Sequence, residues 1–185
     1  DTTFVFSAGQ NIPYPVSQRN PLVWKLKEFV NRAAAGITTT APLGKRALIH
    51  EGVSHEKVHV VPNCVDPDQF APSDSFSHSD VGLPDGIADN LTILFAHRLS
   101  EQKGVPYLLK AFESLRNRVD NCNLVLLGEN MLEDAQYHAI QDANDIYHLE
   151  RVAYTKMAAL YNIADIFVLP SVSIVNNEEQ FGMTA

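Results

Sequence analysis

The chain has 185 residues, and 45% of them are hydrophobic, a share that is ordinary for a globular protein with a sizeable core. Its formal net charge of -8 argues against a nonspecific nucleic-acid binder, because such proteins need a basic face to neutralise phosphates. No apolar run has the length that a bilayer-spanning helix requires.

The start at Asp1 shows neither an initiator Met nor a signal-peptide pattern, and an apolar strand is predicted at once over residues 4–6. We therefore expect a piece of a longer protein, cut at both ends. Cys64 and Cys122 lack metal-site spacing. We predict two buried thiols in a reducing compartment, and no metal site.

Strands and helices are predicted to alternate up to about residue 61. The apolar spacing over 22–33 favours a helix, with Pro21 near its start and Gly36 after its end. Strands are predicted at 37–40 and 58–61, and a short helix between them begins near Pro42. Turn-forming residues then dominate 62–68 and 72–86, which predicts a linker with few apolar anchors.

The alternation resumes after this stretch, so we place a domain boundary near residues 72–90. Strands are predicted at 92–96, 124–127 and 166–169, with a shorter run at 146–149, and helices at 105–115, 133–144 and 157–164. Strands that are apolar on both faces and separated by helices are typical of a parallel sheet covered on both sides. The predicted class is doubly wound α/β.

Two cations follow the predicted strand 92–96, Arg98 and Lys103. Ligands of open parallel sheets bind at the carboxyl ends of the strands, next to helix N-termini, so both side chains are placed to hold an anion such as a diphosphate. The alternative is that both are solvated loop cations.

A second candidate segment lies at the end of the chain, where Glu179 precedes Phe181 and Gly182. A carboxylate there would hold sugar hydroxyls while the free amides of Gly182, Met183 and Thr184 face an anionic group. The alternative is that Glu179 is an exposed loop acid. Because Glu178 is its neighbour, the sequence leaves open which of the two carboxylates takes this place. Dinucleotide, P-loop and nucleophile-elbow motifs are absent from the sequence.

Several segments, taken in order, resemble the retaining glycosyltransferases of the GT-B fold, family 4, also called glycosyl transferases group 1. The resemblance runs from about Val30 to the last residue. The segments are Val60-Val61-Pro62-Asn63-Cys64-Val65-Asp66 with Phe70 and Pro72, Arg98-Leu99 with Lys103-Gly104, the run from Leu124 to Gly128, Leu160-Tyr161 with Ala164-Asp165, Pro170-Ser171, and Glu179-x-Phe181-Gly182.

This resemblance implies a two-domain, metal-independent hexosyltransferase that moves a sugar from a nucleotide-diphosphate donor to an acceptor with retention of configuration. Arg98 and Lys103 match the cations that hold the donor diphosphate and act in catalysis. Glu179 matches the first, catalytic carboxylate of the E-x7-E motif. Phe181, Gly182, Met183 and Thr184 match the donor-binding segment, and Val152 matches the loop near the base.

By the same resemblance, residues 1–75 are the end of the N-terminal, acceptor-side Rossmann-like domain plus the linker, and 76–185 are a truncated donor-binding domain. The implied partners are the nucleotide sugar and a saccharide, lipid-linked or small-molecule acceptor, with no cofactor and no nucleic acid. The implied location is cytoplasmic, extending to peripheral contact with the inner face of a membrane.

The sequence departs from the family pattern at three glycines, which are His97, Cys64 and Glu150 here. The second Glu of the motif would fall beyond Ala185, so we expect this fragment alone to be inactive. Two alternatives remain open: a noncatalytic GT-B-like nucleotide-binding module, and a sugar-nucleotide epimerase of the same architecture.

Overall fold

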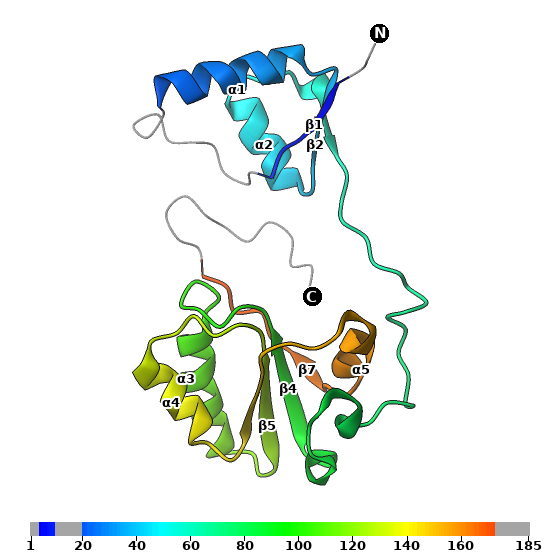
Figure 1. Cartoon of the computed structure of the whole chain (residues 1–185), viewed down its shortest axis with the longest axis vertical. Helices are drawn as coiled ribbons and strands as arrows, with labels where there is room; N and C mark the ends of the chain where they lie inside the picture. The colour runs from blue at the N-terminus through cyan, green and yellow to red at the C-terminus, as the bar shows by residue number, and fades with distance from the viewer. Residues whose placement is uncertain (1–3, 10–19, 173–185) are drawn as a thin grey trace. The chain divides into compact units, whose positions relative to one another are not determined.

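A computed structural model describes residues 4–9 and 20–172 of the chain (Figure 1). The chain divides into two compact units, and the division lies between Cys64 and Val65. This point precedes the region near 72–90 where composition predicts a boundary. Each unit is described by itself.

The first unit contains a parallel sheet in the order β1-β2-β3. Asn20 caps the first helix, since its Oδ1 accepts hydrogen bonds from the amides of Leu22 at 3.0 Å and Val23 at 3.3 Å. The predicted strands and helices of this region are confirmed. Their bounds are β1 Val5–Ser7, α1 Pro21–Ala33, β2 Gly36–Thr39, α2 Pro42–His50 and β3 Val58–Val60, with a 3-10 turn at His55–Lys57.

The second unit contains a four-stranded sheet in the order β6-β5-β4-β7, and every pair is parallel. The doubly wound α/β class is therefore confirmed. The strands are β4 Leu91–Ala96, β5 Cys122–Leu127, β6 Ile146–Leu149 and β7 Ile166–Phe167. The last one is shorter than the predicted 166–169, and only Ile166 and Phe167 pair with β4.

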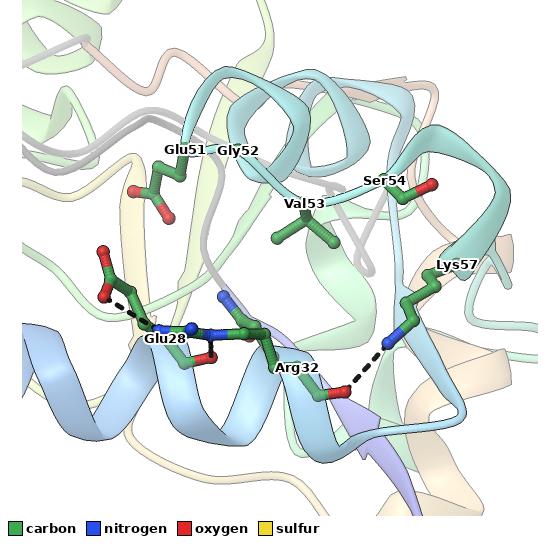
Figure 2. Close-up of a pocket in the computed structure, with 8 residues that line it drawn as sticks. Glu28, Arg32, Glu51, Gly52, Val53, Ser54 and Lys57 are labelled. Atoms are coloured by element: carbon green, nitrogen blue, oxygen red, sulfur yellow. Dashed lines mark hydrogen bonds and ion pairs between the residues drawn. The ribbon is translucent and has the colours of Figure 1, made fainter.

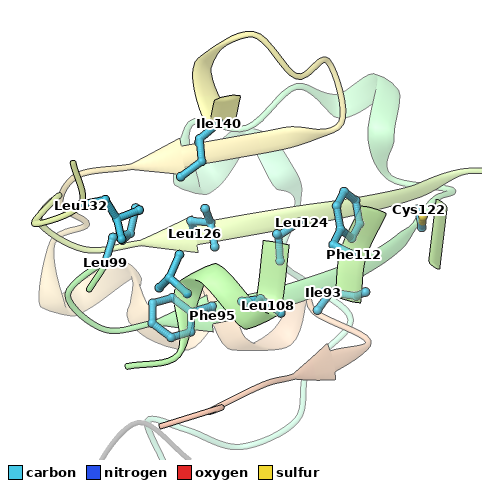
Figure 3. Packing of buried hydrophobic residues seen from close by; sticks show 11 residues of the cluster. Ile93, Phe95, Leu99, Leu108, Phe112, Cys122, Leu124, Leu126, Leu132 and Ile140 are labelled. Carbon is cyan, nitrogen blue, oxygen red and sulfur yellow. The ribbon is translucent and has the colours of Figure 1, made fainter. Parts of the chain in front are cut away.

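Both faces of this sheet are buried, which explains why its central strands are apolar except at Thr92 and Asn123. On one face, α3 (Val105–Arg116) and α4 (Asp134–Gln141) pack on side chains that include Phe95, Leu124 and Leu126 (Figure 3). On the other face, α5 (Met157–Asn162) packs on Leu94 and Val125.

The predicted linker is largely part of the second unit. Its Ser- and Asp-rich stretch forms 3-10 turns at His78–Val81 and Asp85–Ile87, and Val81, Leu83 and Ile87 are buried in the same core as α5. The expectation of few apolar anchors was wrong, because isolated apolar residues between turns carry no periodic signal yet fill a core.

Residues just before these turns are also fixed to the second unit. The ring of Phe70 meets those of Tyr154 and Tyr161 edge-on, each with centroids 6.1 Å apart. The Asn162 side chain accepts from the Ser73 amide at 2.7 Å and donates to the Ala71 carbonyl at 3.3 Å. The segment that follows Val65 is therefore held along α5.

Replacing Asn162 by Ala is expected to release this segment. The change removes a partner from the Ser73 amide, and a hydrogen bond of this kind contributes about 1 kcal/mol net. Hydrogen exchange of the Ser73 amide should accelerate about fivefold, since about 1.4 kcal/mol corresponds to a factor of ten. Asn117→Ala is the control, because Asn117 bonds only within its own helix end. Equal exchange in both variants would contradict the anchoring role.

The two cysteines differ in exposure. Cys122 is buried, as predicted, and burial raises the pKa of its thiol. Cys64 is exposed, so the prediction of a second buried thiol was wrong. It lies in a segment without regular structure between Pro62 and Pro67, where no core is close enough to cover it.

Within the described ranges, we find no helix that combines the length and apolarity needed to cross a bilayer.

Candidate functional site

The order of the second sheet places a topological switch point between β4 and β7. The chain leaves β4 to build β5 and β6 on one side, and returns to add β7 on the other. In open parallel sheets, ligands bind outside the carboxyl ends of the strands at such a point. Arg98 and Lys103 follow β4, and Pro170 and Ser171 follow β7, so both chain segments begin at this crevice.

A cavity of about 330 Å³ opens at the same edge of the sheet. Its size is at the lower end of the range for ligand pockets. Residues from the ends of three adjacent strands and from the start of α5 line it. They are Ala96, His97 and Arg98 at the end of β4, Leu127 and Gly128 at the end of β5, Glu150, Arg151 and Val152 after β6, and Met157.

Two of the predicted donor-binding residues, Arg98 and Val152, therefore lie around one cavity although they are far apart in sequence. Arg98 is exposed, and its backbone amide donates to Nδ1 of His97 at 2.8 Å. This bond shows how the turn accommodates His97 where the family has glycine. The imidazole folds back onto the next amide of its own chain.

Lys103 lies deeper than Arg98 and is not among the residues that line this cavity. Its side chain is only 8% exposed, in a turn where its amide donates to the carbonyl and the hydroxyl of Ser100 at 3.2 and 3.3 Å. The turn ends at Gly104, the N-cap of α3, with φ of 74°. The amides of Gly104, Val105 and Tyr107 at this helix start donate to nearby carbonyls, and Pro106 has no N–H, so the positive end of the helix dipole and the Lys103 ammonium are what favour an anion here.

Gly104 also ties the turn to the strand across the switch point. A Cβ atom at this position would lie 2.0 Å from the carbonyl oxygen of Pro170, a distance that real side chains do not reach. The amide of Val172 donates to the Gln102 carbonyl at 3.0 Å, which joins the same two segments again. The Lys103 turn and the chain after β7 are therefore packed backbone to backbone.

The pattern analysis of the sequence missed Gly128, Arg151 and Met157, all of which line the cavity. Gly128 and Arg151 come directly after parallel strands, and this position is the signal that identifies them. Most of the surface that lines the cavity is apolar, and the charged side chains of Arg98, Glu150 and Arg151 around it are exposed.

The other predicted site residues, Glu179, Phe181, Gly182, Met183 and Thr184, lie outside the described residues.

A separate cavity of about 420 Å³ lies in the first unit between the C-terminal ends of α1 and α2 (Figure 2). Its cations are engaged by the protein. Lys57 donates to the carbonyls of Arg32 and Ala34, each at 3.0 Å, and Arg32 pairs with Glu28 at 3.4 Å. Lys57 thus caps the end of α1. The cavity lies at the amino ends of β2 and β3, whereas ligands of parallel sheets bind at the carboxyl ends.

Comparison with solved structures identifies the fold. HepE from Anabaena in complex with UDP superposes on 92% of this chain and 47% of its own length, with a TM-score of 0.70 and 18% identity. Sucrose-phosphate synthase from Thermosynechococcus elongatus superposes on 98% of this chain and 46% of its own length, with a TM-score of 0.68 and 18% identity. The chain has the GT-B type of α/β fold with parallel sheets.

Sequence comparison identifies the family. The D-inositol 3-phosphate glycosyltransferase of Paenarthrobacter aurescens is 29% identical over 166 residues, which are 86% of this chain and 39% of that protein. The chain therefore spans about two fifths of the length of this curated relative. The profile of one family, described as glycosyl transferases group 1, matches residues 85–185, more than half of the chain. This match shows that the chain, with its cavity at the switch point of a parallel sheet, belongs to the glycosyl transferases group 1 family.

Proposed function

We propose that the complete protein transfers a hexosyl group from a nucleotide-diphosphate sugar to an acceptor hydroxyl with retention of configuration. The observation that carries this proposal is the cavity where Arg98 and Val152 meet at the carboxyl ends of β4 and β6, in a member of this family. The alternative of a noncatalytic nucleotide-binding module predicts the same cavity without transfer.

In the proposed reaction, the bond between the sugar anomeric carbon and the diphosphate oxygen breaks, and the nucleoside diphosphate leaves with the electron pair. The acceptor oxygen forms the new bond on the same face of the sugar, and its proton passes to the departing diphosphate oxygen. Negative charge thus grows on the departing diphosphate. Arg98 and Lys103 offset this charge, and they do so more strongly once water is displaced.

The remaining roles follow the resemblance and are part of the proposal. Glu179 acts beside the donor sugar, the segment of Phe181, Gly182, Met183 and Thr184 contacts sugar and phosphate, and Val152 lies near the base. Residues 76–185 then belong to the donor-binding domain, and residues 1–75 to the acceptor-side domain with the linker. We expect residues 1–185 alone not to catalyse transfer, because much of the acceptor side of the family fold is not among them.

Relatives suggest which ligands to test first. HepE was crystallised with UDP, and the Paenarthrobacter relative is named D-inositol 3-phosphate glycosyltransferase. We propose UDP-sugars as the first donors to test, with a saccharide, lipid-linked or small polyol acceptor.

The proposal is tested with the complete protein and a panel of UDP-, ADP- and GDP-sugars. Calorimetry measures binding, and product analysis by NMR measures transfer and anomeric configuration. One donor should bind, and the product should keep the donor's anomeric configuration. Binding without transfer to any acceptor would favour the noncatalytic module, and conversion of the free sugar nucleotide into its epimer would favour the epimerase.

Replacing Glu179 by Gln in the complete protein is expected to lower kcat at least about 100-fold, because an electrostatic contact that strengthens in the transition state is lost. Nucleoside diphosphate affinity should stay within about threefold, since a sugar-facing group contributes little to it. Glu178→Gln is the matched control and should keep most of the activity. The opposite result, with Glu178→Gln inactive and Glu179→Gln active, would assign the sugar-facing carboxylate to Glu178 instead.

A further inference from the structure

The imidazole of His148, in the middle of β6, lies between α4 and the loop after β5, which lines the candidate donor site. Its Nε2 lies 2.8 Å from the carbonyl oxygen of Gly128, and its Nδ1 lies 2.9 Å from the hydroxyl of Tyr137 in α4. The Tyr137 ring stands edge-on to the imidazole, with centroids 5.4 Å apart at an angle of 87°. Both side chains are half-buried.

The partners determine the tautomer of this histidine. A carbonyl oxygen only accepts hydrogen bonds, so Nε2 carries the proton that is donated to Gly128. The Nδ1 atom of the neutral ring then accepts from the Tyr137 hydroxyl. The two hydrogen bonds are thus donated in the same direction: the Tyr137 hydroxyl donates to His148, and His148 donates to the Gly128 carbonyl.

Gly128 in turn supports the loop that carries Arg98. A Cβ atom on Gly128, whose φ is 139°, would lie 2.2 Å from the carbonyl oxygen of His97 and 3.1 Å from the amide nitrogen of Arg98. The backbone of Gly128 is therefore in direct contact with the peptide between His97 and Arg98. The same glycine lines the cavity at the ends of the strands.

Backbone hydrogen bonds on either side hold the two loops together. The His97 amide donates to the Leu127 carbonyl, the Leu99 amide to the Glu129 carbonyl, and the Met131 amide to the Leu99 carbonyl, each at 2.9 Å. Arg98 is thus the centre of a short ladder between residues 97–99 and 127–131. A shift of the Gly128 peptide would move this ladder and the guanidinium with it.

We propose that His148 is a positioning residue for the Arg98 loop: its Nε2–H bond fixes the Gly128 peptide on which the His97–Arg98 backbone rests, and Tyr137 sets the tautomer that donates this bond. The part of the inference that concerns donor binding rests on the function proposed above. The glycosyltransferase resemblance assigns no role to His148 or Tyr137. The roles proposed for these two residues rest on their hydrogen bonds in this chain.

Two substitutions separate positioning from packing. His148→Phe keeps a ring of similar size on β6 but removes both hydrogen bonds, and Tyr137→Phe removes only the hydroxyl that sets the tautomer. His148→Gln keeps an amide N–H that reaches the Gly128 carbonyl. His138→Phe is the matched control, because this histidine is exposed on α4 and belongs to none of these contacts.

Amide hydrogen exchange in the complete, ligand-free protein tests the contact without any nucleotide. In His148→Phe, exchange at Leu99 and Met131 is expected to accelerate about fivefold or more, since their bonds join the two loops. Exchange at Leu94, in the middle of β4, is expected to stay unchanged. Nitrogen NMR of the unaltered protein should show the Nε2–H tautomer of His148, and Tyr137→Phe should reduce its population.

Calorimetry with UDP, ADP and GDP on the same proteins tests the link to the donor. The nucleotide that binds the unaltered protein should bind His148→Phe about five- to tenfold more weakly and Tyr137→Phe about two- to threefold more weakly, with His148→Gln close to the unaltered protein. Should His148→Phe fail to fold, Tyr137→Phe and His148→Gln carry both measurements.

Unchanged exchange at Leu99 and Met131 would overturn the positioning role, whatever the affinities. Faster exchange with unchanged affinity would overturn it as well, because His148 would then serve only the packing of β6 on α4. If no nucleotide binds the unaltered protein, the proposed function fails, and the exchange data still show separately whether His148 holds the loop.

Discussion

Replacing Lys103 by Met is expected to weaken nucleoside diphosphate binding to the complete protein by about 10- to 100-fold. Lys103 is only 8% exposed and lies in the turn that starts α3, so its charge acts where water screens it poorly. Hydrogen bonds to charged groups contribute about 1.5–3 kcal/mol, and about 1.4 kcal/mol corresponds to a factor of ten. Met keeps the aliphatic stem and therefore most of the packing.

Calorimetry checks this result, with a thermal melt to establish that the variant is folded. Arg98→Ala should produce a loss of the same order, since Arg98 lines the cavity itself. Lys110→Met is the control, because Lys110 is exposed on α3 beyond the first turn. An affinity of Lys103→Met equal to that of the control would remove Lys103 from the donor site.

Replacing Gly104 by Ala is expected to destabilise the second unit by about 2–5 kcal/mol. The φ of 74° costs a residue with a side chain about 1–2 kcal/mol. The new Cβ would also lie 2.0 Å from the Pro170 carbonyl oxygen, and forcing backbone apart in a packed region costs about 1–3 kcal/mol more. The start of α3 and the chain after β7 would have to separate, so donor binding should fall as well.

Denaturant unfolding of the complete protein checks this result, and the chain offers a matched control. Gly82 has a φ of 85°, close to that of Gly104, but nothing lies within 4 Å of its Cβ position. Gly82→Ala is therefore expected to cost only the conformational part, about 1–2 kcal/mol. Equal losses in the two variants would show that Pro170 does not approach Gly104 closely in solution.

Apolar periodicity was sufficient to predict most helices and strands. The helix stripe of Val105, Leu108 and Phe112 and the continuous run of β5 repeat with the periods that a covered parallel sheet imposes. The stretch at 72–86 was mispredicted as a linker because Val81 and Leu83 lie between turns and repeat with no period. Their burial depends on α5, which follows much later in the chain.

The candidate site was predicted only where a motif or a strand end pointed to it. Arg98 was named from its place after a predicted strand and Val152 from the resemblance, and the structure places both at one cavity, while their roles stay predictions. Arg151 and Met157 were not named, because neither carries a recognisable motif. They enter the cavity lining through the register of β5 with β6, in which Leu127 pairs with Leu149.

Local patterning and the ordered motifs were thus enough to specify the α/β class, the parallel sheets and the family of this protein. The contacts between distant residues were not specified in this way. Three such contacts join residues whose separation in sequence follows no local period. They are the approach of Gly104 to Pro170, the hydrogen bonds of Asn162 to residues 71–73, and the hydrogen bond from His148 to Gly128. The contacts of Gly104 with Pro170 and of His148 with Gly128 arise only when parallel crossovers bring the carboxyl ends of the strands to one edge of the sheet, because loops far apart in sequence must pack against each other there. The Asn162 contact forms where α5 ends, just before β7 begins, and likewise needs the folded second unit.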